Sequence, residues 1–285
     1  MLFCSGVVFL FGLIIGSFLN VVVCRLNNFD QAPARKNTPI EGRFLLGGRS
    51  FCPRCRHQLS WFDNLPLISF FLLKGRCRYC RQPISWQYPL VELTAAVISV
   101  AVLWWQNLYF QLLICQFAEA VKPAICLERM IFFVYTLFIF YCLIAIFASD
   151  FVYQTIPDQI SYPAILISIF YRLLRPSFRI FLVSGLGGAW LFFLMHWLTK
   201  GKGMAIGDVK LALLLGLFLG WPGVGFCLYL AFLTGGLFGL ILILTGRKKF
   251  GQVVAFGPFL VLAAASVFFA QDYLILFYHR LIGLS

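Results

Sequence analysis

The longest uncharged stretch of the chain, residues 211–246, limits most strongly what this sequence can fold into. A single helix over these 36 residues would be about 54 Å long, whereas the hydrocarbon core of a bilayer is about 30 Å thick. The sequence Gly220-Trp221-Pro222-Gly223 near its middle is typical of a turn. We therefore predict two membrane-spanning helices joined as a hairpin.

The rest of the chain has the same character, since 61% of its residues are hydrophobic and only 12% are charged. This composition excludes an ordinary soluble domain. The first stretch, Leu2–Val23, has no basic start and no clear cleavage site, so we expect a retained anchor and not a removed signal peptide. We predict an all-α polytopic membrane protein with about eight transmembrane helices. Its remaining apolar segments are Tyr88–Trp105, Met130–Ser149, Ile160–Tyr171, Ile180–Thr199 and Val253–Tyr278.

The basic residues predict how these helices are oriented. Of the 23 lysines and arginines, 11 lie between Arg25 and Arg81, directly after the first apolar segment. If eight spans alternate, Lys200, Lys202, Lys210 and residues 247–249 fall on the same side, which gives 17 basic residues on one face and six on the other. The positive-inside rule makes the crowded face cytoplasmic. Both termini would then lie outside.

The net charge of +13 also raises the question of nucleic-acid binding. No nucleic-acid recognition motif accompanies the charge, and membrane topology accounts for it more simply. Basic cytoplasmic loops are attracted to anionic lipid. We therefore expect the lipid bilayer as a partner, and no nucleic acid.

The loop after the first span contains two C-x2-C motifs, Cys52–Cys55 and Cys77–Cys80. Two such knuckles supply the four thiolates that a tetrahedral zinc ion requires. Disulfides are disfavoured in a cytoplasmic loop, so the alternative is four free thiols. We favour a structural zinc site, because the spacing and the compartment agree. A closed four-cysteine site leaves no open coordination position, so we expect it to support the fold and not to take part in catalysis. The other six cysteines are scattered in or beside apolar segments, where they are typical of small hydrophobic residues.

Two aspartates, Asp150 and Asp208, stand where apolar segments meet polar loops. Ionisable residues at membrane depth are costly and usually functional. The predicted topology brings both to the cytoplasmic face. Two close carboxylates can share a proton and activate water for hydrolysis without a metal. Either aspartate alone would be read as a helix cap at the membrane interface.

Several motifs resemble the prepilin peptidases, which are bifunctional type IV leader peptidases and N-methyltransferases of the GxGD-type intramembrane aspartyl peptidases. The segment Gly16-Ser17-Phe18-Leu19-Asn20-Val21-Val22 resembles the first span of that family. The loop from Arg49 to Glu92 is similar to its N-terminal domain. Asp150 begins DFVYQTIPD, AIGDVKL surrounds Asp208, and Phe256-Gly257-Pro258-Phe259-Leu260 is similar to a further family signature.

The resemblance implies a bacterial inner-membrane endopeptidase with Asp150 and Asp208 as its catalytic dyad. The substrate would be a type IV prepilin or pseudopilin with a short basic leader, a glycine before the cut and an apolar helix after it. Such enzymes serve pilus, type II secretion or competence systems. Residues 1–24 would form the first helix, 25–87 the cytoplasmic cysteine loop and 88–285 the peptidase domain.

The resemblance also implies methylation of the new N-terminus with S-adenosylmethionine. The chain has no glycine-rich nucleotide motif after a predicted strand, so the residues themselves do not indicate a methyl-donor site. By resemblance we place this activity in the cysteine loop, with Asp63, Lys74 and Glu92 as candidates for cofactor binding.

The chain departs from the family pattern at two positions. Ala205 replaces the first glycine of GxGD, which would stiffen the turn before Asp208. Val152 stands where relatives often have a second aspartate, which leaves Asp150 as the favoured first catalytic acid. Asp158 is its nearest competitor, but an aspartate after a proline at a helix start is typically a cap.

Two rival functions remain at this point. A transporter would use the aspartates as a proton relay, but it would be expected to contain internal repeats, and none is evident here. A non-enzymatic scaffold would dock a cytoplasmic partner through its zinc loop. Such a scaffold would tolerate loss of both aspartates but not of the cysteines.

Overall fold

The computed structural model describes residues 2–31, 50–52, 54–55, 57–106, 123–201, 204–246 and 255–282. Across these ranges the regular structure is helical, apart from two isolated β-bridges in the cysteine loop. The predicted all-α fold is confirmed. Contacts divide the chain into two compact units, residues 1–148 and 149–285.

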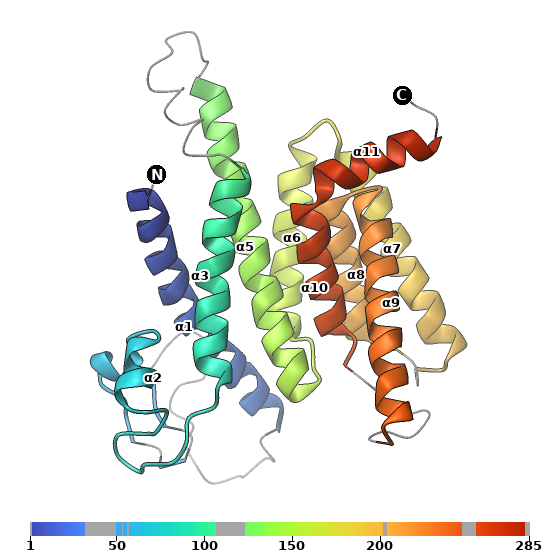
Figure 1. The fold of residues 1–285 in the computed structure, drawn as a ribbon. Coiled ribbons are helices and arrows are strands. Elements are labelled where there is room, and N and C mark those ends of the chain that lie inside the picture. Colours follow the sequence, from blue (N-terminus) through green and yellow to red (C-terminus); the bar gives the residue numbers. More distant parts are fainter. Residues whose placement is uncertain are drawn as a thin grey trace. The chain divides into compact units, whose positions relative to one another are not determined.

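In the first unit the cysteine loop connects two long helices, α1 (Leu2–Gln31) and α3 (Gln87–Trp105), in the sequence (Figure 1). Its last helix, α5, crosses the boundary, so that the end of α5 belongs to the second unit. The other elements are η1 (Trp61–Asn64), α2 (Ile68–Leu72) and α5 (Pro123–Tyr153).

Helices α1 and α3 pack against each other because two glycines lie one turn apart on α1. A β-carbon on Gly12 would lie 2.6 Å from the Cα of Ala96, and one on Gly16 would lie 2.7 Å from the Cα of Glu92. Small residues four positions apart allow two membrane helices to approach at backbone distance. This close packing fixes the start of α3 against α1.

The second unit is a helical bundle built around α8. This helix packs against α6, α7, α9 and α10, and its leucines Leu211, Leu214 and Leu215 are fully buried. A helix that is apolar all round is expected at such a central position. The elements are α6 (Asp158–Leu173), α7 (Phe178–Leu198), α8 (Ile206–Leu219), α9 (Gly223–Leu244), α10 (Gly257–Phe269) and α11 (Gln271–Ile282).

Each of the seven predicted apolar segments contains at least one helix, and the predicted hairpin turn lies between α8 and α9. Five helices among the described residues are long and apolar enough to cross a bilayer. Helices α6 and α8 are shorter, at 16 and 14 residues. The chain is therefore an integral membrane protein, while the number of spans stays a prediction. The five are Phe3–Asn27, Gln87–Trp105, Leu127–Tyr153, Phe178–Leu198 and Gly223–Leu244.

The last apolar segment, predicted to form one span, is not a single straight helix. It consists of α10 and α11, which are bent by 78° at their junction. Helix α11 carries Asp272 in its first turn and His279 and Arg280 in its last. Polar residues on an otherwise apolar helix are typical of a helix at the membrane interface.

Several basic residues on which the predicted orientation depends lie outside the described residues. This applies to Lys202, to residues 247–249 and to most basic residues before Ser50. The same is true of Cys115 among the scattered cysteines. The orientation in the membrane therefore stays a prediction.

Candidate functional site

Asp208 lies in the first turn of α8, at the head of the central helix of the second unit. Its side chain accepts a hydrogen bond from the backbone N–H of Ala205 at 3.3 Å, so it caps its own helix. Ala205 has φ −82° and ψ 153°, an extended conformation that any residue adopts. The alanine in place of the family glycine therefore imposes no strain on the turn.

Asp150 lies in the last turn of α5, within the second unit. Its side chain is as buried as that of Asp208, with 5% and 6% of the two residues exposed. The two acids are near enough for the charge of Asp150 to act on the carboxylate of Asp208. The fold thus joins two residues that are 58 positions apart in the sequence.

One oxygen of the Asp150 carboxylate lacks a hydrogen-bond partner among the described residues, while the backbone N–H of Gly257 donates a hydrogen bond to the carboxylate. The unpaired oxygen is Oδ2, which is buried. An unpaired buried oxygen is costly and uncommon, and among the described residues Asn20 Oδ1 is the other such side-chain atom. The start of α10 lies against Oδ2 of Asp150, because a β-carbon on Gly257 would be only 2.5 Å from it. The motif around Gly257 therefore reaches the aspartate site.

Asp158, the competitor for the first catalytic role, has a different environment. It opens α6, and its side chain is 52% exposed. Its Oδ1 atom accepts a hydrogen bond from Lys210 Nζ at 2.6 Å, and Lys210 also lies 4.7 Å from the centre of the Tyr162 ring. Asp158 and Lys210 thus form a surface ion pair that joins α6 to α8.

In the first unit, the sulfur atoms of Cys52, Cys55, Cys77 and Cys80 all lie within 4.8 Å of one another. Each C-x2-C knuckle is closed by a β-bridge, Phe51 with Gln58 and Arg76 with Pro83. The sulfurs of Cys52 and Cys80 are 3.9 Å apart. Tetrahedral zinc with Zn–S bonds of about 2.3 Å needs sulfurs about 3.8 Å apart, so the cluster fits zinc.

The thiols of this cluster differ in acidity. Burial opposes ionisation of Cys52, but hydrogen bonds from the backbone of Cys55 and Arg54 and from the thiols of Cys55 and Cys77 outweigh it and lower its pKa to about 7. At Cys80 the backbone N–H of Gln82 favours the thiolate, but burial and the three other thiols raise its pKa to about 11. Four negatively charged thiolates at these distances repel one another unless a cation neutralises them. A metal ion is such a cation, so the cluster has the character of a metal site.

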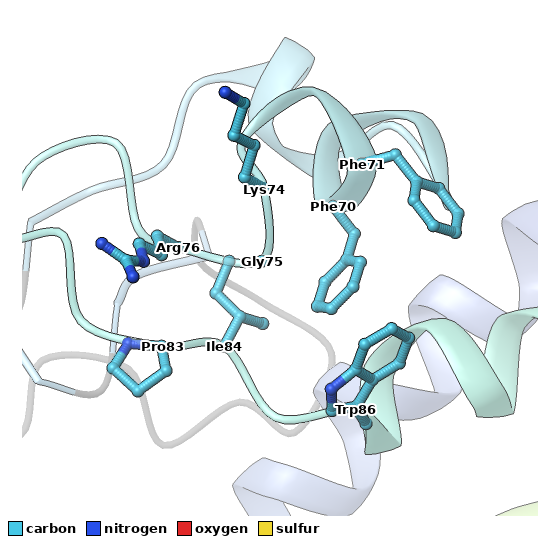
Figure 2. Close-up of a pocket in the computed structure, with 8 residues that line it drawn as sticks. All are labelled: Phe70, Phe71, Lys74, Gly75, Arg76, Pro83, Ile84 and Trp86. Atoms are coloured by element: carbon cyan, nitrogen blue, oxygen red, sulfur yellow. The ribbon is translucent and has the colours of Figure 1, made fainter.

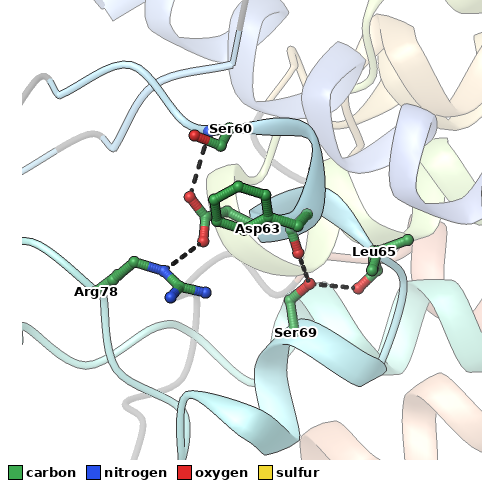
Figure 3. A network of polar contacts seen from close by, with 6 residues as sticks. Ser60, Asp63, Leu65, Ser69 and Arg78 are labelled. Carbon is green, nitrogen blue, oxygen red and sulfur yellow. Dashed lines mark hydrogen bonds and ion pairs between the residues drawn. The ribbon is translucent and has the colours of Figure 1, made fainter.

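Asp63 lies in η1, in a network that holds the cysteine loop together (Figure 3). Its carboxylate accepts hydrogen bonds from Arg78 Nε at 2.9 Å and from the backbone N–H of Ser60 at 3.2 Å. The hydroxyl of Ser69 donates to the carbonyl oxygens of Phe62 and Leu65. Through Arg78, Asp63 ties η1 to the second cysteine knuckle.

Glu92 lies in the second turn of α3 and is buried. Its Oε2 atom accepts a hydrogen bond from the backbone N–H of Leu67 at 2.8 Å, and its carboxylate also contacts the side chain of Ser17. Glu92 therefore joins the cysteine loop to α1 and α3.

Lys74, the third candidate for cofactor binding, lies at a pocket of about 340 Å³ in the cysteine loop (Figure 2). Phe70 and Trp86 meet edge to face in its wall, with ring centres 5.0 Å apart. The opposite wall includes Arg76 and Pro83, the two residues that bridge the second cysteine knuckle. The other lining residues are Phe71, Gly75 and Ile84.

Comparisons with known proteins match both units. Residues 10–106 match the Bacterial Peptidase A24 N-terminal domain, and residues 137–244 match the Type IV leader peptidase family. Proteins named prepilin leader peptidase/N-methyltransferase from Aeromonas salmonicida and Aeromonas hydrophila are 32% and 34% identical to the chain, over 90% of it and 88% of each relative. The chain belongs to the type IV leader peptidase family.

A protein of the same name from Pseudomonas aeruginosa is 31% identical over 89% of the chain and 86% of its own length. No solved structure is significantly similar to the chain. Within the family, the A24 N-terminal match contains the cysteine cluster and the pocket, while the leader peptidase match contains Asp150 and Asp208. The resemblance stated from the sequence is confirmed.

The sequence alone does not assign Gly257 to the site. The only signal was the motif that surrounds it, because its contact with Asp150 bridges more than 100 residues of sequence. The partners of Asp63 and Glu92 were also not predicted, since backbone N–H groups supply some of them.

Proposed function

We propose that this protein is an aspartic endopeptidase that removes the leader of type IV prepilin-like proteins, with Asp150 and Asp208 as its catalytic dyad. The observation that carries the proposal is the buried, unpartnered Oδ2 of Asp150 in electrostatic contact with Asp208. The names of the relatives, prepilin leader peptidase/N-methyltransferase, point to the same substrate class.

Two close carboxylates in a poorly solvated site share one proton, because ionising both is expensive. The ionised member of the pair takes a proton from a water molecule as that water attacks the scissile carbonyl. The protonated member donates its proton to the carbonyl oxygen. The free oxygen of Asp150 is available for a hydrogen bond with that water, while Asp208 is held in place by Ala205.

We place this reaction at the cytoplasmic face of a bacterial inner membrane, in agreement with the excess of basic residues in the corresponding loops. A peptide bond inside an apolar helix is protected by its hydrogen bonds, so cleavage requires a locally extended segment. Such a segment is formed at least cost at the membrane interface and next to a glycine. This favours a prepilin or pseudopilin with a glycine before the cut.

The test is to incubate the detergent-solubilised protein with a prepilin and to measure the loss of a leader-length mass. Asp150→Asn and Asp208→Asn should each lower the cleavage rate by at least about 1,000-fold while leaving the protein folded, because each removes one half of the acid–base pair. Asp158→Asn is the matched control, with a change of less than about threefold expected for an exposed ion pair. Normal cleavage by either dyad variant would remove that residue from the dyad.

We further propose that the first unit methylates the new N-terminal amine, with S-adenosylmethionine bound in the pocket of the cysteine loop. The pocket volume of about 340 Å³ lies in the range of small-molecule sites. Phe70 and Trp86 offer aromatic surface for a purine ring or a sulfonium cation, and Lys74 and Arg76 offer positive charge for a carboxylate. When bound, the cofactor supplies the methyl group.

Variants of the pocket test this second activity separately from the first. Lys74→Met and Trp86→Ala should reduce binding of S-adenosylmethionine and the gain of one methyl group on the product, while cleavage changes by less than about threefold. Arg81→Met is the control, since Arg81 is exposed in the same loop but does not line the pocket. Unchanged cofactor binding in both pocket variants would exclude this site.

We also propose that Cys52, Cys55, Cys77 and Cys80 hold a structural zinc ion. Four thiolates complete its coordination and leave no position for substrate. Because the bridge between Arg76 and Pro83 closes one knuckle and also forms a wall of the pocket, zinc would stabilise the pocket directly.

A further inference from the structure

Gly257, the first residue of α10, lies directly against the carboxylate of Asp150. A β-carbon on Gly257 would be 2.5 Å from Oδ2, 3.1 Å from Cγ and 3.4 Å from Cβ of Asp150. The three nearest atoms therefore all belong to this one side chain. Van der Waals contact between carbon and oxygen begins well beyond 3 Å, so a side chain at position 257 and the observed carboxylate position exclude each other.

The φ angle of Gly257 does not itself require glycine. Four described glycines have a positive φ, namely Gly75, Gly201, Gly220 and Gly246, and Gly257 is not among them. Its φ is therefore open to other residues. Pro258 follows directly, however, and a β-carbon before a proline is disfavoured in the helical region. The space taken by the Asp150 carboxylate is the second physical reason for glycine at this position.

Gly257 contacts the carboxylate of Asp150, the member of the dyad with an oxygen that has no hydrogen-bond partner in the described part of the chain. Asp208 is held by the N–H of Ala205, whereas Oδ2 of Asp150 has no hydrogen-bond partner among the described residues. The position of the Asp150 carboxylate depends on Gly257 in two ways. The backbone N–H of Gly257 donates a hydrogen bond to the carboxylate, and the missing side chain leaves room for Oδ2.

We infer that Gly257 is a positioning residue of the peptidase. It sets where the Asp150 carboxylate stands relative to Asp208 and to the attacking water. The inference rests on the proposed function, since it assigns Gly257 a role through Asp150. A larger residue would turn the Asp150 side chain away, which is a small cost for the fold but a large one for a reaction that needs both carboxylates in register.

The experiment compares Gly257→Ala with wild type in the full-length, solubilised protein, with a prepilin as substrate. A misplacement of about 1 Å costs on the order of 100-fold in rate, so kcat should fall about 100-fold while KM changes less than about threefold. The pH dependence of kcat should also shift, because the separation of the two acids changes. A merely structural glycine would not move the pH profile.

Gly236→Ala and Gly239→Ala are the matched controls, since a β-carbon at either position meets no atom within 4 Å. Both lie on α9 in the same unit and should cleave at the wild-type rate. Wild-type kcat and pH profile in Gly257→Ala would overturn the inference while the proposed function stands. If wild type itself does not cleave, or if Asp150→Asn cleaves normally, the proposed function fails instead.

A second variant covers the case in which Gly257→Ala is unstable. If the new methyl group clashes with Asp150, then Asp150→Ala should restore the thermal stability of Gly257→Ala, because shortening residue 150 removes the clash. Equal instability with and without Asp150→Ala would show that the glycine is needed for another contact, and would overturn the inference.

Discussion

Glu92 in the first unit and Asp150 in the second are both buried acids on strongly apolar helices, with 8% and 5% of the residue exposed. In the sequence the two look alike, as costly polar groups at the edge of a span. The structure separates them: Glu92 accepts a hydrogen bond from Leu67 and contacts Ser17, whereas Asp150 has a free oxygen. Satisfied acids hold a fold together, and an unsatisfied one is available for chemistry.

The two units also differ in how well their other polar side chains are satisfied by hydrogen bonds or fit a metal. Asp63 has two donors that fasten the cysteine loop, and the four cysteines fit a metal. Asp208 has one backbone hydrogen bond, from Ala205 at 3.3 Å, and a second acid as its neighbour. We therefore expect changes in the first unit to appear mainly in stability and methylation, and changes in the second mainly in cleavage.

Removal of the metal should cause the largest difference between the effects on methylation and on cleavage. Treatment with a chelator, or Cys52→Ser combined with Cys77→Ser, should open both knuckles and lower methylation by more than about 100-fold, because structural zinc contributes folding free energy directly. Cleavage should fall by less than about tenfold. Equal loss of both activities would erase the distinction between the two units. Zinc content and both activities are measured on the same preparations.

Replacing Glu92 tests the comparison at a single buried acid. Glu92→Ala leaves the N–H of Leu67 without its acceptor, which should lower the free energy of unfolding by about 1–3 kcal/mol. Cleavage at a temperature where the variant remains folded should stay within about threefold of wild type. Thermal unfolding and the cleavage assay together decide the outcome. A folded variant that no longer cleaves would place Glu92 in the catalytic machinery.

The smallest expected effect is a change in how zinc affinity depends on pH. Zinc binds thiolates, and the pKa of Cys52 is lowered to about 7. Above that pH Cys52 is already ionised and zinc displaces no proton from it, whereas below it zinc must do so. The logarithm of affinity should therefore fall more steeply below pH 7, by one additional decade per pH unit. Zinc competition with a chromophoric chelator measures this slope, and a constant slope from pH 6 to 8 would contradict the lowered pKa.

The apolar segments predict the helices well, because an uncharged run of membrane length leaves the backbone few alternatives. They predict the last segment less well. Most residues of this segment are apolar, so the polar residues of α11, namely Asp272, His279 and Arg280, did not by themselves indicate a separate helix. A single span is predicted, whereas α10 and α11 are bent at their junction.

The sequence pointed to the four cysteines through their spacing, which is local information. It could not show what the backbone contributes to each site. The contact between Gly257 and Asp150, the cap from Ala205 to Asp208 and the bond from Leu67 to Glu92 all involve main-chain atoms. The N–H groups of Ala205 and Leu67 occur in every residue except proline, so no residue type marks them, and a glycine in a motif does not show which side chain it contacts.

The central claim is that Asp150 and Asp208 act as one catalytic unit. The most direct measurement is a double-mutant cycle of single-turnover cleavage with Asp150→Asn, Asp208→Asn and the combined variant. Residues that act together lose their function together, so the combined variant should be no slower than either single one. If the two losses multiply instead, the acids act separately and the shared-proton account is wrong.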